Sequence, residues 1–196
     1  MNRLISKLAL GVSFTLISSS ALAETQTFQA GVTVQNAFVL TKTADLDFGI
    51  IRATADLGGA DTATLVLSAN PATSPSTATS NAAAAEIAVL TAGTPAAFSV
   101  SGVSPFATLT ITDPIETEIS PDAAPAGTAG FTLSAPTYYV LTGATPNSAA
   151  TTTIQVDSTG EATFNVGATL TTSAIVTTAD YIDGTYSGTF TLQLDY

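Results

Sequence analysis

Hydroxyl and carboxylate groups are the side chains in this sequence that could support catalysis. The 196 residues include no histidine, cysteine or tryptophan, so the chain has no imidazole base, no thiolate nucleophile and no disulfide. A serine or threonine nucleophile would need a base, and the only lysine after residue 23 is Lys42. Its context, Thr41-Lys42-Thr43, lacks the spacing of a Ser–Lys hydrolase. We therefore expect Lys42 to be a solvated residue at a strand end.

Paired carboxylates are the remaining candidates for acid–base chemistry or for an oxygen-rich metal site. Asp45 and Asp47 would share a strand face, as would Glu116 and Glu118. Residues 56–61 place two aspartates around a Gly-Gly pair, but they match neither calcium-binding loop of known spacing. A solvated turn explains such a segment better. We predict no catalytic residue, no metal site and no cofactor, and hence a protein that is not an enzyme.

The charge balance limits the partners of the chain. Arg3 and Lys7 lie within the first 23 residues, so the remainder carries two basic and fifteen acidic residues, a net charge of −13. Lys42 and Arg52 alone form no basic patch, which argues against nucleic-acid binding and against attachment to anionic lipid. Only 10 % of residues are charged and 45 % are hydrophobic, which indicates a packed domain rather than a disordered chain.

The first 23 residues have the pattern of a cleaved secretory signal. Arg3 and Lys7 precede an apolar run over residues 8–17, and Ala21 and Ala23 form an A-x-A cleavage site. The apolar run is shorter than the roughly 20 residues that span a bilayer, and we expect no transmembrane segment after cleavage. The pattern predicts export to the periplasm, the cell surface or the extracellular space.

Alternation with a period of two dominates the sequence after Phe28. Runs rich in Val, Ile, Thr, Phe and Tyr are separated by Gly, Pro, Asn, Asp and Ser, which is typical of strands joined by turns. We predict an all-β chain, with an N-terminal strand over residues 24–35 and one β-sandwich domain of about eight to ten short strands over residues 36–196. A closed barrel is the alternative.

Turn chemistry marks two junctions, and two other segments resemble loops. Residues 157–160 (Asp-Ser-Thr-Gly) predict a short connection between two strands, and Asp183-Gly184 precedes the last strand. Ser, Thr and Pro predict an exposed loop over residues 69–85. Prolines and glycines predict a second loop over residues 113–130.

The two ends of the chain carry the clearest alternation. At the N-terminal end, one face of the predicted strand holds Phe28, Ala30, Val32 and Val34. Near the other end, one face holds Tyr186, Phe190, Leu192, Leu194 and Tyr196. The N-terminal segment is either the first strand of its own domain or a strand offered to a neighbouring molecule.

Four motifs carry a resemblance to a known family. They are Leu46-Asp47-Phe48-Gly49, residues 97–102 (AFSVSG), residues 160–167 (GEATFNVG) and residues 184–191 (GTYSGTFT). In order and spacing they resemble the bacterial secreted family called domain of unknown function 4402, over residues 34–196. The LDFG element and the last strand are also similar to the spore coat protein U domain of archaic chaperone–usher pilins.

The pilin resemblance implies an immunoglobulin-like sandwich that lacks one strand. Its open hydrophobic groove would be filled by an assembly chaperone and then by the N-terminal segment of the next subunit. Here the donor would be residues 27–35, and the groove would run beside residues 186–196. The partners implied are other copies or related subunits, with a periplasmic chaperone and an usher. The cysteine-free sequence departs from these pilins, which usually carry a disulfide.

We therefore expect a structural surface subunit, pilin-like or adhesin-like, that assembles by strand donation. The alternative is a self-contained binding module, for example for a glycan, with its site on residues 69–85 or on Tyr138 or Tyr139. Because adjacent strand residues point to opposite faces, at most one of these two tyrosines is exposed.

Overall fold

The fold of the described residues is entirely β. The computed structural model describes residues 24–33, 37–121, 124–173 and 179–196, and within these ranges it contains fourteen strands and no helix. The sequence-based prediction of an all-β chain is therefore confirmed. The chain divides into two compact units, Met1–Val34 and Gln35–Tyr196. The predicted signal at residues 1–23 and position Val34 lie outside the described residues.

The strands of the second unit range from two to twelve residues, and all their pairings are antiparallel. They are β1 (Val39–Ala44), β2 (Asp47–Thr54), β3 (Ala63–Leu67), β4 (Ser76–Thr79), β5 (Glu86–Thr94), β6 (Ala96–Ser101) and β7 (Thr108–Thr112). The others are β8 (Thr117–Pro121), β9 (Phe131–Thr142), β10 (Ser148–Ala150), β11 (Thr153–Gln155), β12 (Ala162–Thr172), β13 (Tyr186–Ser187) and β14 (Gln193–Asp195).

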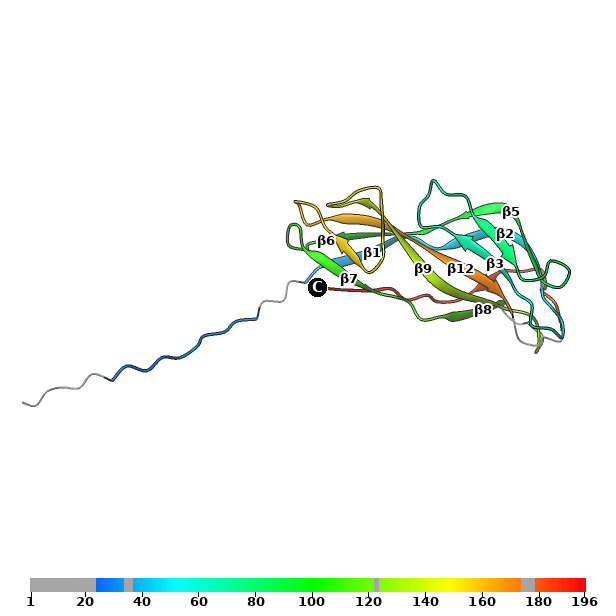
Figure 1. Cartoon of the computed structure of the whole chain (residues 1–196), viewed down its shortest axis with the longest axis horizontal. Helices are drawn as coiled ribbons and strands as arrows, with labels where there is room; N and C mark the ends of the chain where they lie inside the picture. The colour runs from blue at the N-terminus through cyan, green and yellow to red at the C-terminus, as the bar shows by residue number, and fades with distance from the viewer. Residues whose placement is uncertain (1–23, 34–36, 122–123, 174–178) are drawn as a thin grey trace, which may run out of the picture. The chain divides into compact units, whose positions relative to one another are not determined.

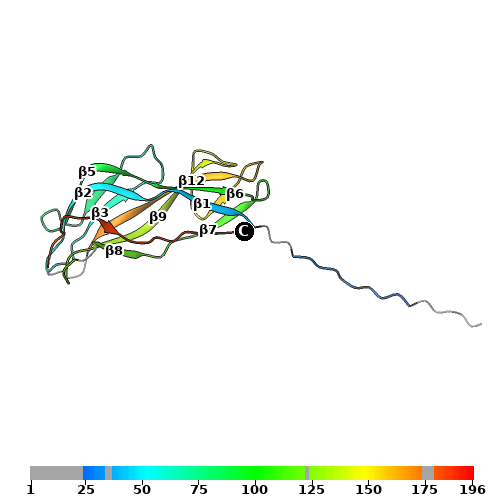
Figure 2. The same cartoon turned by 180° about the vertical axis from the view of Figure 1, so that it is seen from behind.

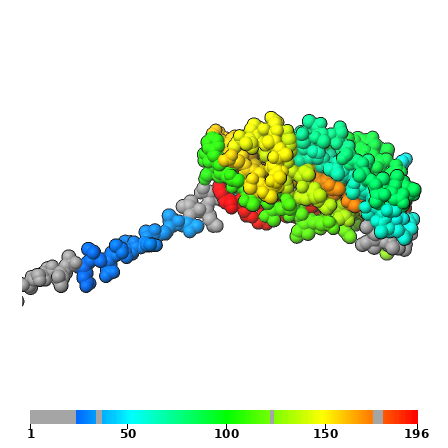
Figure 3. All heavy atoms as spheres, viewed as in Figure 1, coloured from blue at the N-terminus to red at the C-terminus, as the bar shows by residue number. Residues whose placement is uncertain are grey.

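Three sheets result from these pairings. The largest has nine strands in the order β1-β6-β12-β9-β8-β13, with β10 paired to β9, β3 paired to β12 and β4 paired to β3. The second sheet is β11-β7-β14, and the third is the pair β2-β5 (Figure 1). The long strand β12 is the centre of the largest sheet, since it pairs with β6, β3 and β9. In the space-filling view part of β12 shows as an orange strip between its neighbours (Figure 3).

Two long extended runs pass from one sheet to another. The run of β1 and β2 lies antiparallel to the run of β5 and β6, so that β1 pairs with β6 in the largest sheet and β2 with β5 outside it (Figure 2). The register shifts between Lys42 and Ala44 and again between Ile50 and Ile51. Such bulges bend and twist a strand. The count of fourteen exceeds the predicted eight to ten in part because β4 and β8 lie in segments predicted to be loops, and because the predicted last strand is divided into β13 and β14.

Two hydrophobic clusters hold the sheets together. The first joins the nine-stranded sheet to the three-stranded sheet and includes Phe164 and Leu109, which are fully buried, and Leu194. The second joins the other half of the nine-stranded sheet to β5 and includes Leu65, Leu170 and Ile87. Since the chain has no disulfide, burial of these apolar side chains is the main source of its stability.

Both segments that were predicted to be loops contain a strand. Residues 69–85 include β4, which pairs with β3 although all four of its residues are exposed. Residues 113–130 include β8, which pairs with β9 and β13. Serine, threonine and proline predict loops from local preference alone, whereas pairing with a neighbouring strand can make such a segment a strand, as β3 does for β4 and β9 does for β8. These two loop predictions were wrong for residues 76–79 and 117–121.

The predicted turn at residues 157–160 is present and is held by the carboxylate of Asp157. Its Oδ1 accepts hydrogen bonds from the hydroxyl of Thr159 and from the backbone N–H groups of Thr159 and Glu161. These hydrogen bonds lower the pKa of Asp157, and the bond from the Thr159 hydroxyl contributes most. Gly160 has φ of +79° and its Cα lies against the carbonyl of Val103. The turn connects β11 to β12, which belong to different sheets, so it is a crossing between layers and not a hairpin.

Residues 24–33 form no strand in this single chain, although their alternation predicts one. All ten side chains are exposed, and the exposed fractions of Phe28 and Val32 are 90 % and 87 %. A strand needs a neighbour to satisfy its N–H and C=O groups. The predicted strand therefore requires an edge with which to pair.

Three aromatic rings close one end of the second hydrophobic cluster. Tyr181 stacks on Phe131 with ring centroids 4.3 Å apart, and Tyr186 meets Phe131 edge to face at 5.2 Å. The hydroxyl of Tyr181 donates to the carbonyl of Gly130 at 2.6 Å and accepts from the N–H of Ser173 at 3.1 Å. Burial raises the pKa of Tyr181 well above its usual value. This tyrosine is held neutral in the folded protein.

The raised pKa of Tyr181 predicts a loss of stability in alkali. An unfolded tyrosine ionises near pH 10, so its contribution is complete below that pH and is lost as the pH rises toward the higher folded-state value. We expect the melting temperature, followed by circular dichroism, to fall above about pH 10. The variant Tyr181→Phe cannot ionise at this position and should show a shallower fall. Parallel falls in the two proteins would contradict the assignment.

Candidate functional site

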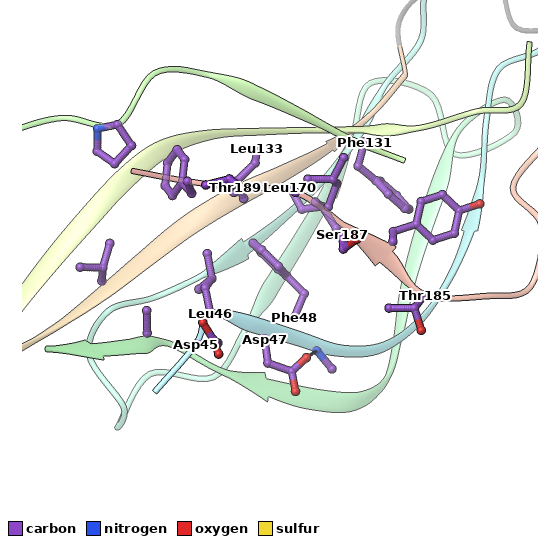
Figure 4. A pocket seen from close by; sticks show the side chains of 18 of the residues that line it. Asp45, Leu46, Asp47, Phe48, Phe131, Leu133, Leu170, Thr185, Ser187 and Thr189 are labelled. Carbon is purple, nitrogen blue, oxygen red and sulfur yellow. Dashed lines mark hydrogen bonds between the residues drawn. The ribbon is translucent and has the colours of Figure 1, made fainter. Parts of the chain in front are cut away.

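An elongated opening leads from the surface into the apolar interior of the second unit. Its volume is about 760 Å³. One rim is formed by residues 45–51, which include the start of β2, and the other by residues 184–190 and Leu192. We call this opening the groove. Figure 4 shows Leu46 and Phe48 on one side of it, pointing toward Phe131, Leu133 and Leu170 on the other.

The first rim is built from the Leu46-Asp47-Phe48-Gly49 motif. The Oδ1 of Asp47 accepts a hydrogen bond of 2.8 Å from the N–H of Gly49. Gly49 has φ of +81°, and a Cβ there would lie 2.1 Å from the carbonyl oxygen of Thr91. The local turn at Asp47–Gly49 directs the side chains of Leu46 and Phe48, which are half-buried, into the interior. Strand β2 pairs with β5 along one edge, and no strand in the described part of the chain pairs with its other edge.

The second rim is the C-terminal extended segment. Strand β13 pairs with β8 and strand β14 pairs with β7, so the segment is attached along one side at both ends (Figure 2). Residues 188–192 between these strands have no assigned ladder. Tyr186, Phe190 and Leu192 are half-buried and line the groove. Like β2, this segment has a partner strand on one side only among the described residues.

The floor of the groove consists of side chains from the nine-stranded sheet. Near Lys42 it is formed by Ala96, Phe98 and Val166, where Phe98 stacks on the buried Phe164 at 5.5 Å. Near Tyr186 it is formed by Phe131, Leu133, Leu170 and Ile119. Apolar groups therefore extend along the whole length of the groove.

The structure brings together three of the five residues predicted on the terminal strand. Tyr186, Phe190 and Leu192 line the groove. Leu194 instead belongs to the first hydrophobic cluster, with 7 % of its surface exposed. Tyr196 is half-exposed; its ring meets Phe38 edge to face at 5.7 Å and its hydroxyl accepts from the N–H of Ser104. These two residues lie beyond the groove and close the adjoining end of the fold.

The predicted donor residues belong to the first unit. Phe28, Ala30 and Val32 are exposed within residues 24–33, and Val34 is outside the described residues. Sequence reasoning missed that residues 45–51 form the first rim, although their LDFG motif had been noted. The signal that could have located this rim is Gly49 within an apolar run, with Asp47 two residues before it, because this pair forms the turn at the rim.

Charged groups at the groove have local partners. Lys42 forms an ion pair with Asp45, and both side chains are largely exposed. Within the described ranges no three His, Cys, Asp or Glu residues are grouped closely enough to hold a metal ion. Tyr138 is buried and donates to Asp113 at 2.8 Å, while Tyr139 is partly exposed, as the strand geometry predicted. The groove is suited to burying apolar side chains and pairing with a backbone.

The open groove predicts a contrast between two phenylalanines. Phe164 is fully buried, so Phe164→Ala should cost about 3–5 kcal/mol of unfolding free energy. Phe48 lines the open groove and loses less contact on truncation, so Phe48→Ala should cost about half of that or less. Urea unfolding of the single chain measures both values. Equal costs would mean that the groove is closed in solution.

A protein-family model described as "Domain of unknown function (DUF4402)" matches residues 38–196. Searches of curated proteins and of solved structures found no match to this chain. None of the described residues lies in a helix that could cross a membrane.

Proposed function

We propose that this chain, which belongs to the DUF4402 family, is an exported, non-enzymatic structural subunit that assembles by strand donation. The donor is the N-terminal segment of one copy, residues 27–35, and the acceptor is the groove of another. The subunit is pilin-like or adhesin-like and lies at the cell surface or in the extracellular space. Export is supported by the secretory pattern of residues 1–23.

The observation that carries the proposal is a groove with strand edges on both rims and apolar side chains between them. An added strand would pair with the free edge of β2, with residues 188–192, or with both. The same strand would cover Phe48, Phe190 and Leu192 with its inward-facing side chains. Adding a strand thus satisfies backbone groups and buries apolar surface in one step.

The donor matches the groove in pattern and in length. Phe28, Ala30 and Val32 alternate with Gln29, Gly31 and Thr33, so an extended segment would present an apolar face to the floor. Phe28 to Val34 covers seven residues, as do the rim residues 45–51 and 184–190. The exposed fractions of 90 % for Phe28 and 87 % for Val32 leave these side chains free to be buried.

The local geometry of the second rim supports an immunoglobulin-like reading of the fold. The hydroxyl of Tyr186 accepts from the N–H of Ile182 at 3.0 Å and donates to its carbonyl at 3.1 Å. Such a bond from a tyrosine to the backbone a few residues upstream is typical of the sixth strand of immunoglobulin-like sandwiches. The pairing of β13 and β14 with β8 and β7 fits the same strand. The unoccupied position beside this segment would then correspond to the seventh strand of such a sandwich.

The proposed partners follow from strand donation. Other copies, or related subunits with a similar N-terminal segment, would occupy the groove in the assembled state. A periplasmic chaperone would cover it before assembly, and an usher would accept the subunit at the outer membrane. The chaperone and the next subunit would each supply a strand to the same edges.

Deletion of residues 27–34 tests the donor. The truncated chain should stay monomeric, or remain bound to a chaperone, at concentrations where the full chain assembles, because it still has a groove but has no strand to offer. Light scattering and electron microscopy measure this, and circular dichroism checks that the truncated chain is folded. Assembly of the truncated chain as readily as the full chain would rule out donation by this segment.

A matched pair of substitutions tests which face of the donor is buried. Val32→Asp should weaken association by at least about 100-fold, because it removes a buried valine and places a carboxylate against an apolar floor. Thr33→Asp adds the same charge on the opposite face and should change association by less than about 10-fold. Sedimentation velocity across a dilution series measures both. Equal effects would show that charge, and not the buried face, controls association.

A further inference from the structure

Phe106 has a backbone conformation that its side chain disfavours. The N–H of Ala107 donates to the carbonyl of Ser104 at 3.0 Å and closes a turn in which Phe106 is the third residue, with φ of +58°. Because a proline at the second position, Pro105, has φ near about −65°, this is a type II turn, whose third position favours glycine or asparagine. Among the described residues three others than glycine have positive φ, and of these Phe106 alone has a large side chain.

Burial of the ring does not compensate for this conformation. Phe106 is 58 % exposed. Its N–H donates to the carbonyl of Asp157 and its carbonyl accepts from the side-chain amide of Gln155, each at 3.0 Å. These contacts involve only the backbone of residue 106, so glycine would keep them at a lower cost. A disfavoured conformation that persists at an exposed residue points to a function for its side chain.

A second exposed aromatic ring lies at the same end of the second unit. Tyr196 is 52 % exposed, and its hydroxyl accepts from the N–H of Ser104, the first residue of the turn, at 3.3 Å. The loop between β6 and β7, which carries the turn, lies at the end of this unit where the C-terminus is marked (Figure 1). We call Phe106 and Tyr196 the aromatic tip. Exposed aromatic residues of this kind are enriched in protein–protein interfaces.

Strand β12 extends from this end of the unit to the opposite end. Asp157, whose carbonyl accepts from the N–H of Phe106, lies shortly before the start of β12. Ser173, whose N–H donates to the hydroxyl of Tyr181, directly follows the end of β12. Eleven residues of extended strand cover about 35 Å. The surroundings of Phe106 and of Tyr181 are therefore at opposite ends of the second unit.

The end near Tyr181 carries two exposed aliphatic side chains. Ile182, the next residue, is 40 % exposed. Leu57 is 52 % exposed and lies two residues after Ala55, whose N–H donates to the Oδ1 of Asp180 at 2.8 Å. We call Leu57 and Ile182 the aliphatic tip. The second unit thus exposes apolar side chains at both ends, aromatic at one and aliphatic at the other.

The N-terminal segment joins the second unit at its aromatic end. The ring of Phe38 meets that of Tyr196 at 5.7 Å. Thr33 precedes Phe38 by five residues, so the two Cα atoms are at most about 18 Å apart. A copy whose donor segment is bound to a neighbour therefore keeps its aromatic tip close to that neighbour. This limit depends on the number of residues and on no particular conformation of the connection.

Resting on the assembly of copies proposed above, we infer that the aromatic tip of one copy packs against the aliphatic tip of the next. The contact is separate from strand donation, since none of the four tip residues lines the groove. Contact between two unlike surfaces can repeat in one direction and produces an open chain of subunits, whereas contact between like surfaces closes a dimer. The tips would thus set the direction in which successive subunits follow one another.

Replacing Phe106 by glycine separates binding from folding. Phe106→Gly removes the exposed ring and suits the positive φ, so the urea midpoint of the monomer should not fall. Association, measured by sedimentation velocity across a dilution series, should weaken by at least about 10-fold, because a ring that is buried at the contact is lost. The control Phe106→Tyr keeps an aromatic ring and should associate within about 3-fold of the original chain. Unchanged association of Phe106→Gly would overturn the inference.

A pair of exposed leucines tests the opposite end. Leu57→Ser should weaken association by at least about 5-fold. Leu90→Ser removes a leucine that is 64 % exposed in the middle of β5, and should change association by less than about 2-fold. Combining Leu57→Ser with Phe106→Gly should cost less than the product of the two single losses, because both remove the same contact. A fully multiplicative loss would show that the two tips do not meet.

The donor variant Val32→Asp separates failure of this inference from failure of the proposed function. If Val32→Asp weakens association and Phe106→Gly does not, the tip contact is wrong and strand donation stands. If Phe106→Gly weakens association and Val32→Asp does not, copies meet through their tips and the N-terminal segment is not the donor. If neither variant changes association, both proposals fall.

Discussion

The free edge of β2 is the constraint on which the rest of this structure depends. A strand edge carries N–H and C=O groups that need partners, and the side chains behind it need cover from water. Here β2 pairs with β5 on one side, and the facing segment over residues 184–192 is likewise attached on one side. Because the two rims do not pair with each other, a groove of about 760 Å³ with an apolar floor separates them.

The groove stays open because the elements on either side are held firmly elsewhere. Strands β1 and β6 belong to the nine-stranded sheet, and β14 is fixed to β7 by the first hydrophobic cluster. Gly49 allows the first rim to turn closely past β5, and the hydroxyl of Tyr186 fixes the start of the second rim to Ile182. A scaffold without disulfides therefore holds two strand edges apart by packing and pairing alone. If it accepts a strand as proposed, the groove is preformed, which would lower the cost of ordering on association.

Much of the fold could be predicted from local patterns. Alternation predicted an all-β chain, and the aspartate and glycine of residues 157–160 predicted a turn whose hydrogen bonds are present. The even-numbered face of the last strand predicted Tyr186, Phe190 and Leu192 on one rim. Strands β4 and β8 were missed, because their polar and proline-containing sequences have little strand preference of their own and become strands only by pairing with β3 and with β9 and β13. The sequence also did not predict that residues 39–54 and residues 86–101 each pass from the nine-stranded sheet to the β2-β5 pair. The bends that allow this depend on how the two runs pack against each other.

By itself the sequence determined the period of the strands, the absence of imidazole and thiol chemistry, and the apolar face of the N-terminal segment. These properties depend on residue types and on spacings of a few positions. The tertiary structure decided that residues 45–51 and 184–192 face each other across an open groove. It also decided that Leu194 is buried in the core and that Tyr196 packs on Phe38. Strand pairing joins residues more than a hundred positions apart, and no local pattern specifies which two edges remain without a partner.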